Sequence, residues 1–265
     1  MHFNFAFTAV QTLWTLTLAA HLVLLVVLLG RDRTKRFRWF FVGIALVTLR
    51  LIASRLLFGR MPQIVLGETF LVLGFISVIV GLLVIAELAR MTFRKASQRA
   101  WGLGIVASLA GSALALIAIG PWPTLESVIP NSLMNSLNLL QLFTQKGGLL
   151  VDLLSVALGL LAVAFGRRLG AGWRSHPQLV ILGLSTASLG QLATQLIWQA
   201  IAKSAAPHSM TEYVHVMGIR EKLLNANSAL YVAVLIWWIL WLWFDEPGVS
   251  ASSKESESSE GSTAG

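Results

Sequence analysis

Four charged side chains stand inside, or at the start of, long apolar stretches of the 265-residue chain: Arg50, Arg55, Glu68 and Asp152. An ionisable side chain at the bilayer centre costs about 2.5–3.5 kcal/mol on insertion scales, so each needs a partner, a water-filled cavity or a function. Counting along the stretches places Arg55, Glu68 and Asp152 within about two helical turns of the same membrane boundary, with Arg50 about one turn deeper. We therefore expect the arginines to contact an anion and the acids to orient them.

Uncharged polar residues accompany these charges on other stretches. Ser188, Gln191, Gln195 and Gln199 are three or four positions apart, a spacing that places them on one face of a helix. Similar polar positions precede or begin other stretches: Gln11, Thr15, Asn225, Asn227 and Ser228. Together they predict a polar cavity in the outer half of a helical bundle. The residues expected to bind a ligand there are Arg50, Arg55, Glu68, Asp152, Gln191 and Gln195.

The same residues have a second interpretation, in which they only tie helices together. Arginine–carboxylate pairs and glutamine hydrogen bonds stabilise helix contacts in membranes by roughly 0.6–2 kcal/mol each. Arg55 is also close enough to a boundary for its long side chain to snorkel to the headgroups. Two features favour the cavity. Arg50 lies deeper than pairing with interfacial acids requires, and the four polar residues from Ser188 to Gln199 extend farther along one helix face than a single helix contact needs.

His21 is the one histidine well inside an apolar stretch, and we expect it to be a hydrogen-bonded core residue. One histidine cannot supply the paired axial ligands of a membrane b-type haem. Glu87 is expected to be an interfacial acid beside Arg90. His208, Glu212 and His215 fall in a predicted loop, where their spacing is a poor metal signal.

Catalytic motifs are missing from the sequence. It contains no GxSG motif, no aspartate-rich motif, no lysine in the middle of the last apolar stretch to bind retinal, and no cysteine. The apolar stretches hold a single aspartate and too few histidines for a zinc site. We therefore predict no enzyme activity, no cofactor and no metal site.

Seven apolar stretches carry these residues, in a chain with 56% hydrophobic and 12% charged residues. A hydrocarbon core of about 30 Å requires roughly 20 residues per helical crossing, and only helices satisfy their own backbone hydrogen bonds over such continuous segments. The fold class predicted is all-α, a seven-helix transmembrane bundle. The expected spans are about 8–29, 38–58, 64–88, 101–120, 148–166, 178–200 and 226–244.

Basic residues alternate between the connecting segments and predict the orientation. The segments after the first, third and fifth stretches hold Arg31, Arg33, Lys35, Arg36, Arg38, Arg90, Arg94, Lys95, Arg99, Arg167, Arg168 and Arg174. The other side holds Arg60, Lys146, Lys203, Arg220 and Lys222. The positive-inside rule then places the N-terminus outside and the C-terminus in the cytoplasm. The net charge of +8 is thus explained by topology rather than by nucleic-acid binding, and short basic loops suit a bacterial inner membrane.

The chain divides into a transmembrane domain, 1–245, and a Ser/Glu-rich tail, 246–265, that is too polar to fold. Longer external segments are expected at 121–147 and 201–225. Within the first, residues 133–145 form either an interfacial amphipathic helix or the first turns of the fifth span. Recurring small residues predict close helix packing: Gly67, Gly74 and Gly81 in the third span, and Ala107 and Gly111 in the fourth.

The predicted function is that of a non-enzymatic, receptor-like or sensor-like membrane protein. It binds a small or lipidic ligand in the outer-half cavity and, since no output domain follows the last helix, acts through a protein partner in the membrane or cytoplasm. One alternative is a structural or accessory subunit of a larger membrane complex. A second is a transporter or channel, although polar residues become scarce in the inner half. Membrane lipids are expected partners in every case.

Overall fold

The computed structural model describes residues 8–93, 98–119, 133–165, 175–204 and 209–244, and these residues form seven α-helices. Six of them are long and apolar enough to cross a membrane, while the described apolar part of the fourth, Gly104–Ala118, is shorter. The all-α fold class is therefore confirmed, with six helices able by length and composition to span a membrane. The predicted tail, 246–265, lies outside the described residues. The helices are α1 (Ala9–Gly30), α2 (Arg38–Leu57), α3 (Gln63–Thr92), α4 (Gln98–Ala118), α5 (Leu133–Phe165), α6 (His176–Ser204) and α7 (Met210–Trp243).

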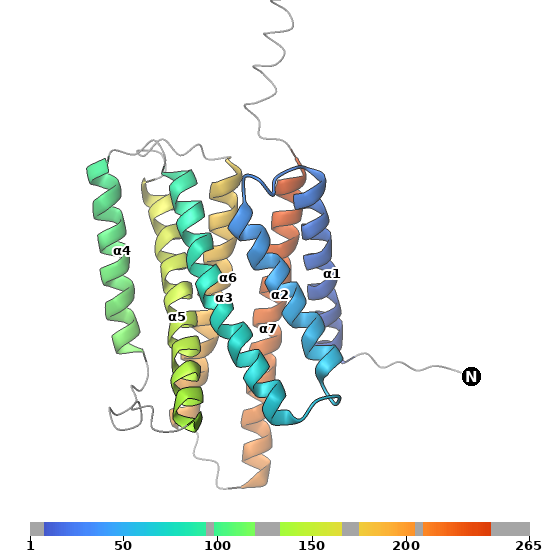
Figure 1. Ribbon diagram of the computed structural model, residues 1–265. Coiled ribbons are helices and arrows are strands. Elements are labelled where there is room, and N and C mark those ends of the chain that lie inside the picture. Colours follow the sequence, from blue (N-terminus) through green and yellow to red (C-terminus); the bar gives the residue numbers. More distant parts are fainter. Residues whose placement is uncertain (1–7, 94–97, 120–132, 166–174, 205–208, 245–265) are drawn as a thin grey trace, which may run out of the picture.

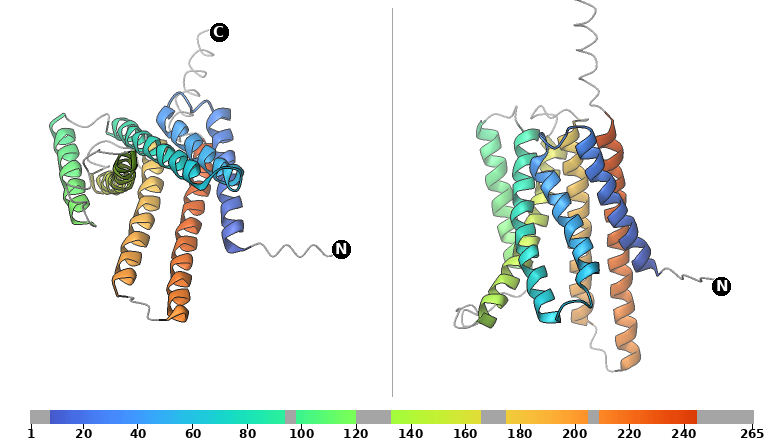
Figure 2. Two further views of the ribbon diagram at one scale, coloured as in Figure 1. Left: turned by 60° about the horizontal axis from the view of Figure 1, so that its bottom comes forward. Right: turned by 45° about the vertical axis from the view of Figure 1, so that its right-hand side comes forward.

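Six of the helices form a closed ring (Figures 1 and 2). Neighbours around it are α1, α2, α3, α5, α6 and α7, and α7 packs back against α1. Helix α4 stands outside the ring and packs mainly against α5. We call the end that holds the α1–α2 turn, the C-termini of α3 and α7 and the N-terminus of α6 the basic end, and the other the opposite end.

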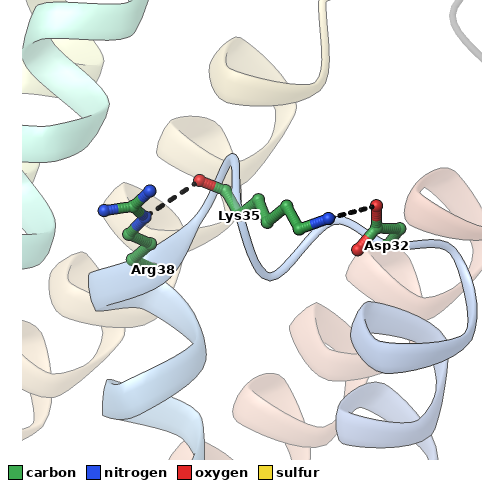
Figure 3. A network of polar contacts seen from close by, with 3 residues as sticks. All are labelled: Asp32, Lys35 and Arg38. Carbon is green, nitrogen blue, oxygen red and sulfur yellow. Dashed lines mark hydrogen bonds and ion pairs between the residues drawn. The ribbon is translucent and has the colours of Figure 1, made fainter.

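The turn between α1 and α2 is fixed by local contacts (Figure 3). Asp32 has a φ of 49°, in the left-handed region that aspartate tolerates better than most residues. Lys35 Nζ lies 3.3 Å from Asp32 Oδ2, and Arg38 Nε donates to the Lys35 carbonyl oxygen at 3.3 Å. These contacts reverse the chain over a few residues and place α2 beside α1.

Glu87 of α3 caps the first turn of α2. Its carboxylate accepts hydrogen bonds from the backbone N–H of Trp39, at 3.1 and 3.2 Å, and from that of Phe40, at 3.1 Å. The N-cap residue itself, Phe37, provides no side-chain hydrogen bond. The acid thus satisfies N–H groups that the start of every helix leaves without a partner. Glu87 was expected to be an interfacial acid beside Arg90, and these hydrogen bonds give it a more specific role as the cap of α2.

A buried polar cluster holds the basic end together. Arg33 donates to His176 Nδ1 at 2.7 Å and to the Phe244 carbonyl oxygen at 2.8 Å. Because a guanidinium can only donate, Nδ1 must accept, so the imidazole proton is on Nε2. That Nε2 lies 3.0 Å from the Phe244 carbonyl oxygen and 3.1 Å from that of Trp241, so its N–H donates to carbonyl groups at the end of α7. The cluster connects the α1–α2 turn, the start of α6 and the end of α7.

Most of the fully buried side chains lie in the half of the bundle near the basic end. Fully buried side chains gather there from four helices: Leu24, Leu28, Leu88, Ile181, Leu235 and Leu242. The apolar core gathers in this half. A mainly apolar hollow of about 480 Å³ also lies there, between α3, α4 and α5, whereas polar side chains line the hollows of the other half.

Glycines bring α3 and α5 close together, as predicted for Gly74 and Gly81. A Cβ on Gly81 would lie 3.0 Å from Val151 Cγ1, and one on Gly74 would lie 2.7 Å from Thr144 Cγ2. The expectation was wrong for Gly67 and for the Ala107–Gly111 pair. A Cβ on Gly67 of α3 would have no neighbour within 4 Å. The same holds for Gly111 of α4, and Ala107 is exposed, because α4 lies at the periphery.

Two helices extend well past their predicted spans. Helix α5 is continuous from Leu133, so residues 133–145 form its first turns rather than a separate interfacial helix. Most of the predicted loop at 201–225 is also helical, since α7 begins at Met210, where Ser209 Oγ accepts the Glu212 N–H at 3.2 Å. The first turns of α7 project beyond the rest of the bundle (Figure 2).

Candidate functional site

A cavity of about 510 Å³ lies between α1, α2, α5, α6 and α7, from the middle of the bundle toward the opposite end. We call it the polar cavity. Its apolar wall includes Leu13, Trp14, Leu51 and Leu184. Its polar wall combines one carboxylate with amides and hydroxyls: Thr17, Asp152, Ser188, Gln191, Asn225, Asn227, Ser228 and Tyr231.

Among the described residues that line the polar cavity, Asp152 is the only charged side chain. It comes from the middle of α5 and is half-buried. The hydroxyl of Ser188, on α6 and 5% exposed, forms a hydrogen bond with its carboxylate. An ionised carboxylate can accept several hydrogen bonds, so one partner leaves acceptor capacity for a ligand.

An amide pair links α6 and α7 on the same wall. Asn227 Nδ2 donates to Gln191 Oε1 at 2.7 Å. Gly190 lets the helices approach here, since a Cβ on it would lie 3.1 Å from Asn227 Oδ1. The pair leaves one amide NH₂ and one amide oxygen for other partners, so the wall offers both donors and acceptors.

His21 and Tyr231 connect α1 and α7 beside the cavity. His21 Nδ1 lies 2.7 Å from the Thr17 carbonyl oxygen and therefore carries the proton. Its Nε2 then accepts the hydroxyl of Tyr231 at 3.0 Å. The imidazole is fully buried, which confirms the expectation of a hydrogen-bonded core histidine.

A smaller cavity of about 150 Å³ continues toward the basic end. We call it the apolar cavity, because hydrocarbon side chains dominate its lining, and it shares Val47, Leu184 and Tyr231 with the polar cavity. Trp238 lines it, and among the described residues nothing accepts a hydrogen bond from its buried Nε1. Polar groups thus become sparse beyond Tyr231.

The six predicted ligand-binding residues do not share one site. Asp152 and Gln191 line the polar cavity. Arg50 and Glu68 line a different groove, between α2, α3 and α5. Arg55 stacks on Trp14, with its Cζ 5.7 Å from the ring centroid, and so reaches the polar cavity only through that indole. Gln195 lies one turn farther along α6, beyond the residues that line either hollow.

The other polar residues predicted for the cavity divide into two groups: some form hydrogen bonds within α1 and the rest line the cavity. Gln11 belongs to the capping box of α1 with Thr8, and the Thr15 hydroxyl donates to the Gln11 carbonyl oxygen at 2.9 Å, so neither lines the cavity. Asn225, Asn227 and Ser228 do line it. Sequence reasoning missed Tyr231, whose signal was a lone hydroxyl within the apolar stretch 229–243.

The polar cavity suits a ligand with an apolar body and a cationic or hydrogen-bond-donating group. The carboxylate and amide oxygens accept hydrogen bonds, while Trp14 and the leucines cover hydrocarbon. Across the described residues, no group of three or more His, Asp or Glu side chains is placed to hold a metal ion. Comparison of the chain with protein-family models, with curated proteins and with solved structures finds no match.

Proposed function

We propose that this protein is a receptor-like membrane protein that binds a small amphiphilic ligand in the polar cavity. The observation that carries the proposal is Asp152, a carboxylate placed among amides and hydroxyls from three helices, with no basic residue among the described residues of the lining. A bilayer-embedded carboxylate is costly unless it is paired or solvated, so a cationic ligand would stabilise it. The ligand class is therefore an amine rather than the anion that Arg50 and Arg55 favoured.

The proposed orientation follows the distribution of basic residues. The α1–α2 turn alone carries Arg31, Arg33, Lys35 and Arg36. The positive-inside rule would place this end in the cytoplasm, with the polar cavity in the outer half and α7 ending inside. The localisation proposed is a bacterial inner membrane. An extracytoplasmic amine would then reach Asp152 from outside, and the response would pass to a protein partner.

The test is direct binding by the full chain in lipid nanodiscs at neutral pH. Three probes share one body and differ in their polar group: 4-phenylbutylamine, 4-phenylbutanol and 4-phenylbutyrate. We expect the amine to bind most tightly and the carboxylate least. Asp152→Asn keeps the shape and the Ser188 contact, and it should weaken amine binding about 10- to 100-fold, as expected for a lost charge-assisted hydrogen bond.

A matched pair on α6 provides the control. Gln191→Leu changes the cavity wall, whereas Gln195→Leu changes the same residue type one turn away and outside the lining. Binding should weaken in the first variant and persist in the second. Equal binding of the three probes, or amine binding that Asp152→Asn leaves unchanged, would contradict the proposal.

A second candidate function is an accessory subunit of a membrane complex. It is favoured by exposed indoles near the end of α7: Trp237, Trp241 and Trp243 are 40%, 39% and 51% exposed. Aromatic residues are enriched at the cores of protein interfaces. Stoichiometric co-purification of another protein, lost in a Trp237→Ala/Trp241→Ala variant, would favour this function. A transporter remains a third candidate, since the two cavities share Tyr231, and it requires a polar path through the apolar cavity.

A further inference from the structure

Arg50 and Glu68 face a common groove that is separate from the polar cavity. We call it the arginine groove; it has a volume of about 560 Å³ and lies between α2, α3 and α5. Its other polar residues are Gln63, Gln141, Thr144 and Gln145. Arg50 and both glutamines of α5 are exposed, so the groove is open to the surroundings of the bundle.

Neither charge has a partner in the part of the chain that the structure describes. Arg50 and Glu68 form no salt bridge or hydrogen bond there, although they line the same groove. An arginine this far inside a helix of a membrane protein needs an anion or water, and a half-buried glutamate equally needs a donor. The groove therefore presents two unmatched charges of opposite sign.

Glu68 lies at the edge of the hydrocarbon, and Arg50 lies deeper. Helix α3 has 30 residues and is about 45 Å long, against about 30 Å of hydrocarbon, so about 7 Å extends past each boundary. Glu68, the sixth residue of α3, lies about 8 Å from its start and thus at the boundary. Arg50 lies about 10 Å from the end of α2 at the same side, and α2 is itself only about 30 Å long, so the Arg50 backbone is deeper than this boundary and its long side chain must extend toward it. The polar headgroups begin at this boundary.

We propose that the arginine groove binds the headgroup of a zwitterionic phospholipid of the phosphoethanolamine type, from the leaflet at the opposite end of the bundle. The phosphate accepts hydrogen bonds from the Arg50 guanidinium, and the primary ammonium donates to the Glu68 carboxylate. An anionic headgroup would satisfy Arg50 but leave Glu68 unpaired beside a negative charge. A quaternary ammonium has no N–H to donate. The ligand proposed for the polar cavity plays no part in this inference.

The test is native mass spectrometry of the full chain in mild detergent, titrated with phosphatidylethanolamine or phosphatidylglycerol of identical acyl chains. We expect the ethanolamine lipid to bind more tightly. Arg50→Gln should weaken both lipids about tenfold, the loss expected for one charge-assisted contact. Glu68→Gln should weaken only the ethanolamine lipid and bring its affinity down to that of the glycerol lipid.

Two controls separate headgroup binding from general effects. Arg60→Gln removes a positive charge from the nearby α2–α3 turn, outside the groove lining, and should leave both affinities unchanged. If Arg50→Gln fails to fold, Arg50→Lys keeps the charge, and the selectivity of the unaltered chain remains a test by itself. Equal binding of the two lipids, or ethanolamine-lipid binding that survives both substitutions, would overturn the proposal.

A soluble probe distinguishes a lipid from a free zwitterion. sn-Glycero-3-phosphoethanolamine carries the same phosphodiester and primary ammonium without acyl chains, so it should fail to displace the lipid at millimolar concentration. Displacement at that concentration, abolished by Arg50→Gln, would overturn the lipid as the source of the headgroup.

Discussion

The hydrogen bond between His21 and Tyr231 allows a quantitative test of how α1 and α7 are joined. Tyr231→Phe removes only the hydroxyl that His21 Nε2 accepts at 3.0 Å. The imidazole is 0% exposed, so its Nε2 has no access to bulk water after the substitution. Leaving a buried acceptor without a partner costs about 1–3 kcal/mol, while interhelical hydrogen bonds in membranes average about 0.6 and reach about 1.7 kcal/mol. We expect Tyr231→Phe to destabilise the bundle by about 1–2 kcal/mol.

The reciprocal substitution should show an asymmetry. His21→Leu leaves the Tyr231 hydroxyl without its acceptor, but Tyr231 lines both cavities, where water can replace the imidazole. The hydroxyl therefore suffers a smaller penalty than the buried imidazole does in Tyr231→Phe. The double variant should cost less than the sum of the two single ones, with a coupling of about 0.6–1.7 kcal/mol.

The assay is reversible unfolding in mixed micelles, followed by far-ultraviolet circular dichroism as the fraction of dodecyl sulfate rises. Thr186→Val is a suitable control, because Thr186 is exposed and its hydroxyl donates only to the Leu182 carbonyl oxygen of its own helix. Its coupling to Tyr231→Phe should be near zero. Single effects of His21→Leu and Tyr231→Phe that add to within about 0.3 kcal/mol would refute the reasoning.

Two further predictions concern the helix contacts that position the sites. Glu87→Ala removes the cap of α2 and should lower the unfolding free energy by about 1–3 kcal/mol. Glu87→Gln retains an acceptor oxygen and should lower it by less. Equal losses in the same unfolding assay would contradict the capping role. Gly183→Ala would place a Cβ 2.8 Å from Trp238 Cε2 and should destabilise by about 1–3 kcal/mol. Gly111→Ala is the control: its added Cβ has no neighbour within 4 Å, so it should be neutral or slightly stabilising. If thermal melts showed Gly111→Ala to be more destabilising than Gly183→Ala, the α6–α7 contact would not be this close.

Hydrophobicity along the sequence predicted seven helices in the right order, but it carried little information about the rotation of each one. Lipid is as apolar as the protein core, so adjacent residues of one kind can have opposite environments. Leu28 is 0% exposed and Leu29 is 59% exposed; Trp238 is 2% exposed and Trp237 is 40%. Nothing in their chemistry distinguishes these pairs.

The candidate site was predicted only in part, because the rotation of each helix was again missing from the sequence. Counting residues placed Arg50, Arg55 and Glu68 in one half of the bundle, but it was wrong for Asp152. That residue was expected within about two turns of a boundary, whereas α5 begins at Leu133 and Asp152 lies in the middle of it. Which of them meet depends on the rotation of α2, and it directs Arg50 toward Glu68 in the arginine groove instead of toward Asp152. Polar residues carried better information: Ser188 and Gln191, predicted to share a face, both line the polar cavity.

Helix α5 contributes side chains to the arginine groove, the apolar cavity and the polar cavity within residues 144–152. Thr144 lines the arginine groove, Val151 lines the apolar cavity and Asp152 lines the polar cavity. Thr144 and Val151 are also the side chains that pack on Gly74 and Gly81 of α3, with no room for an added methyl group. The contacts that bring α3 and α5 together therefore also set the spacing between the sites. Interiors packed this closely do not deform continuously, so a change at one site can reach another only if α5 moves as a unit against α3.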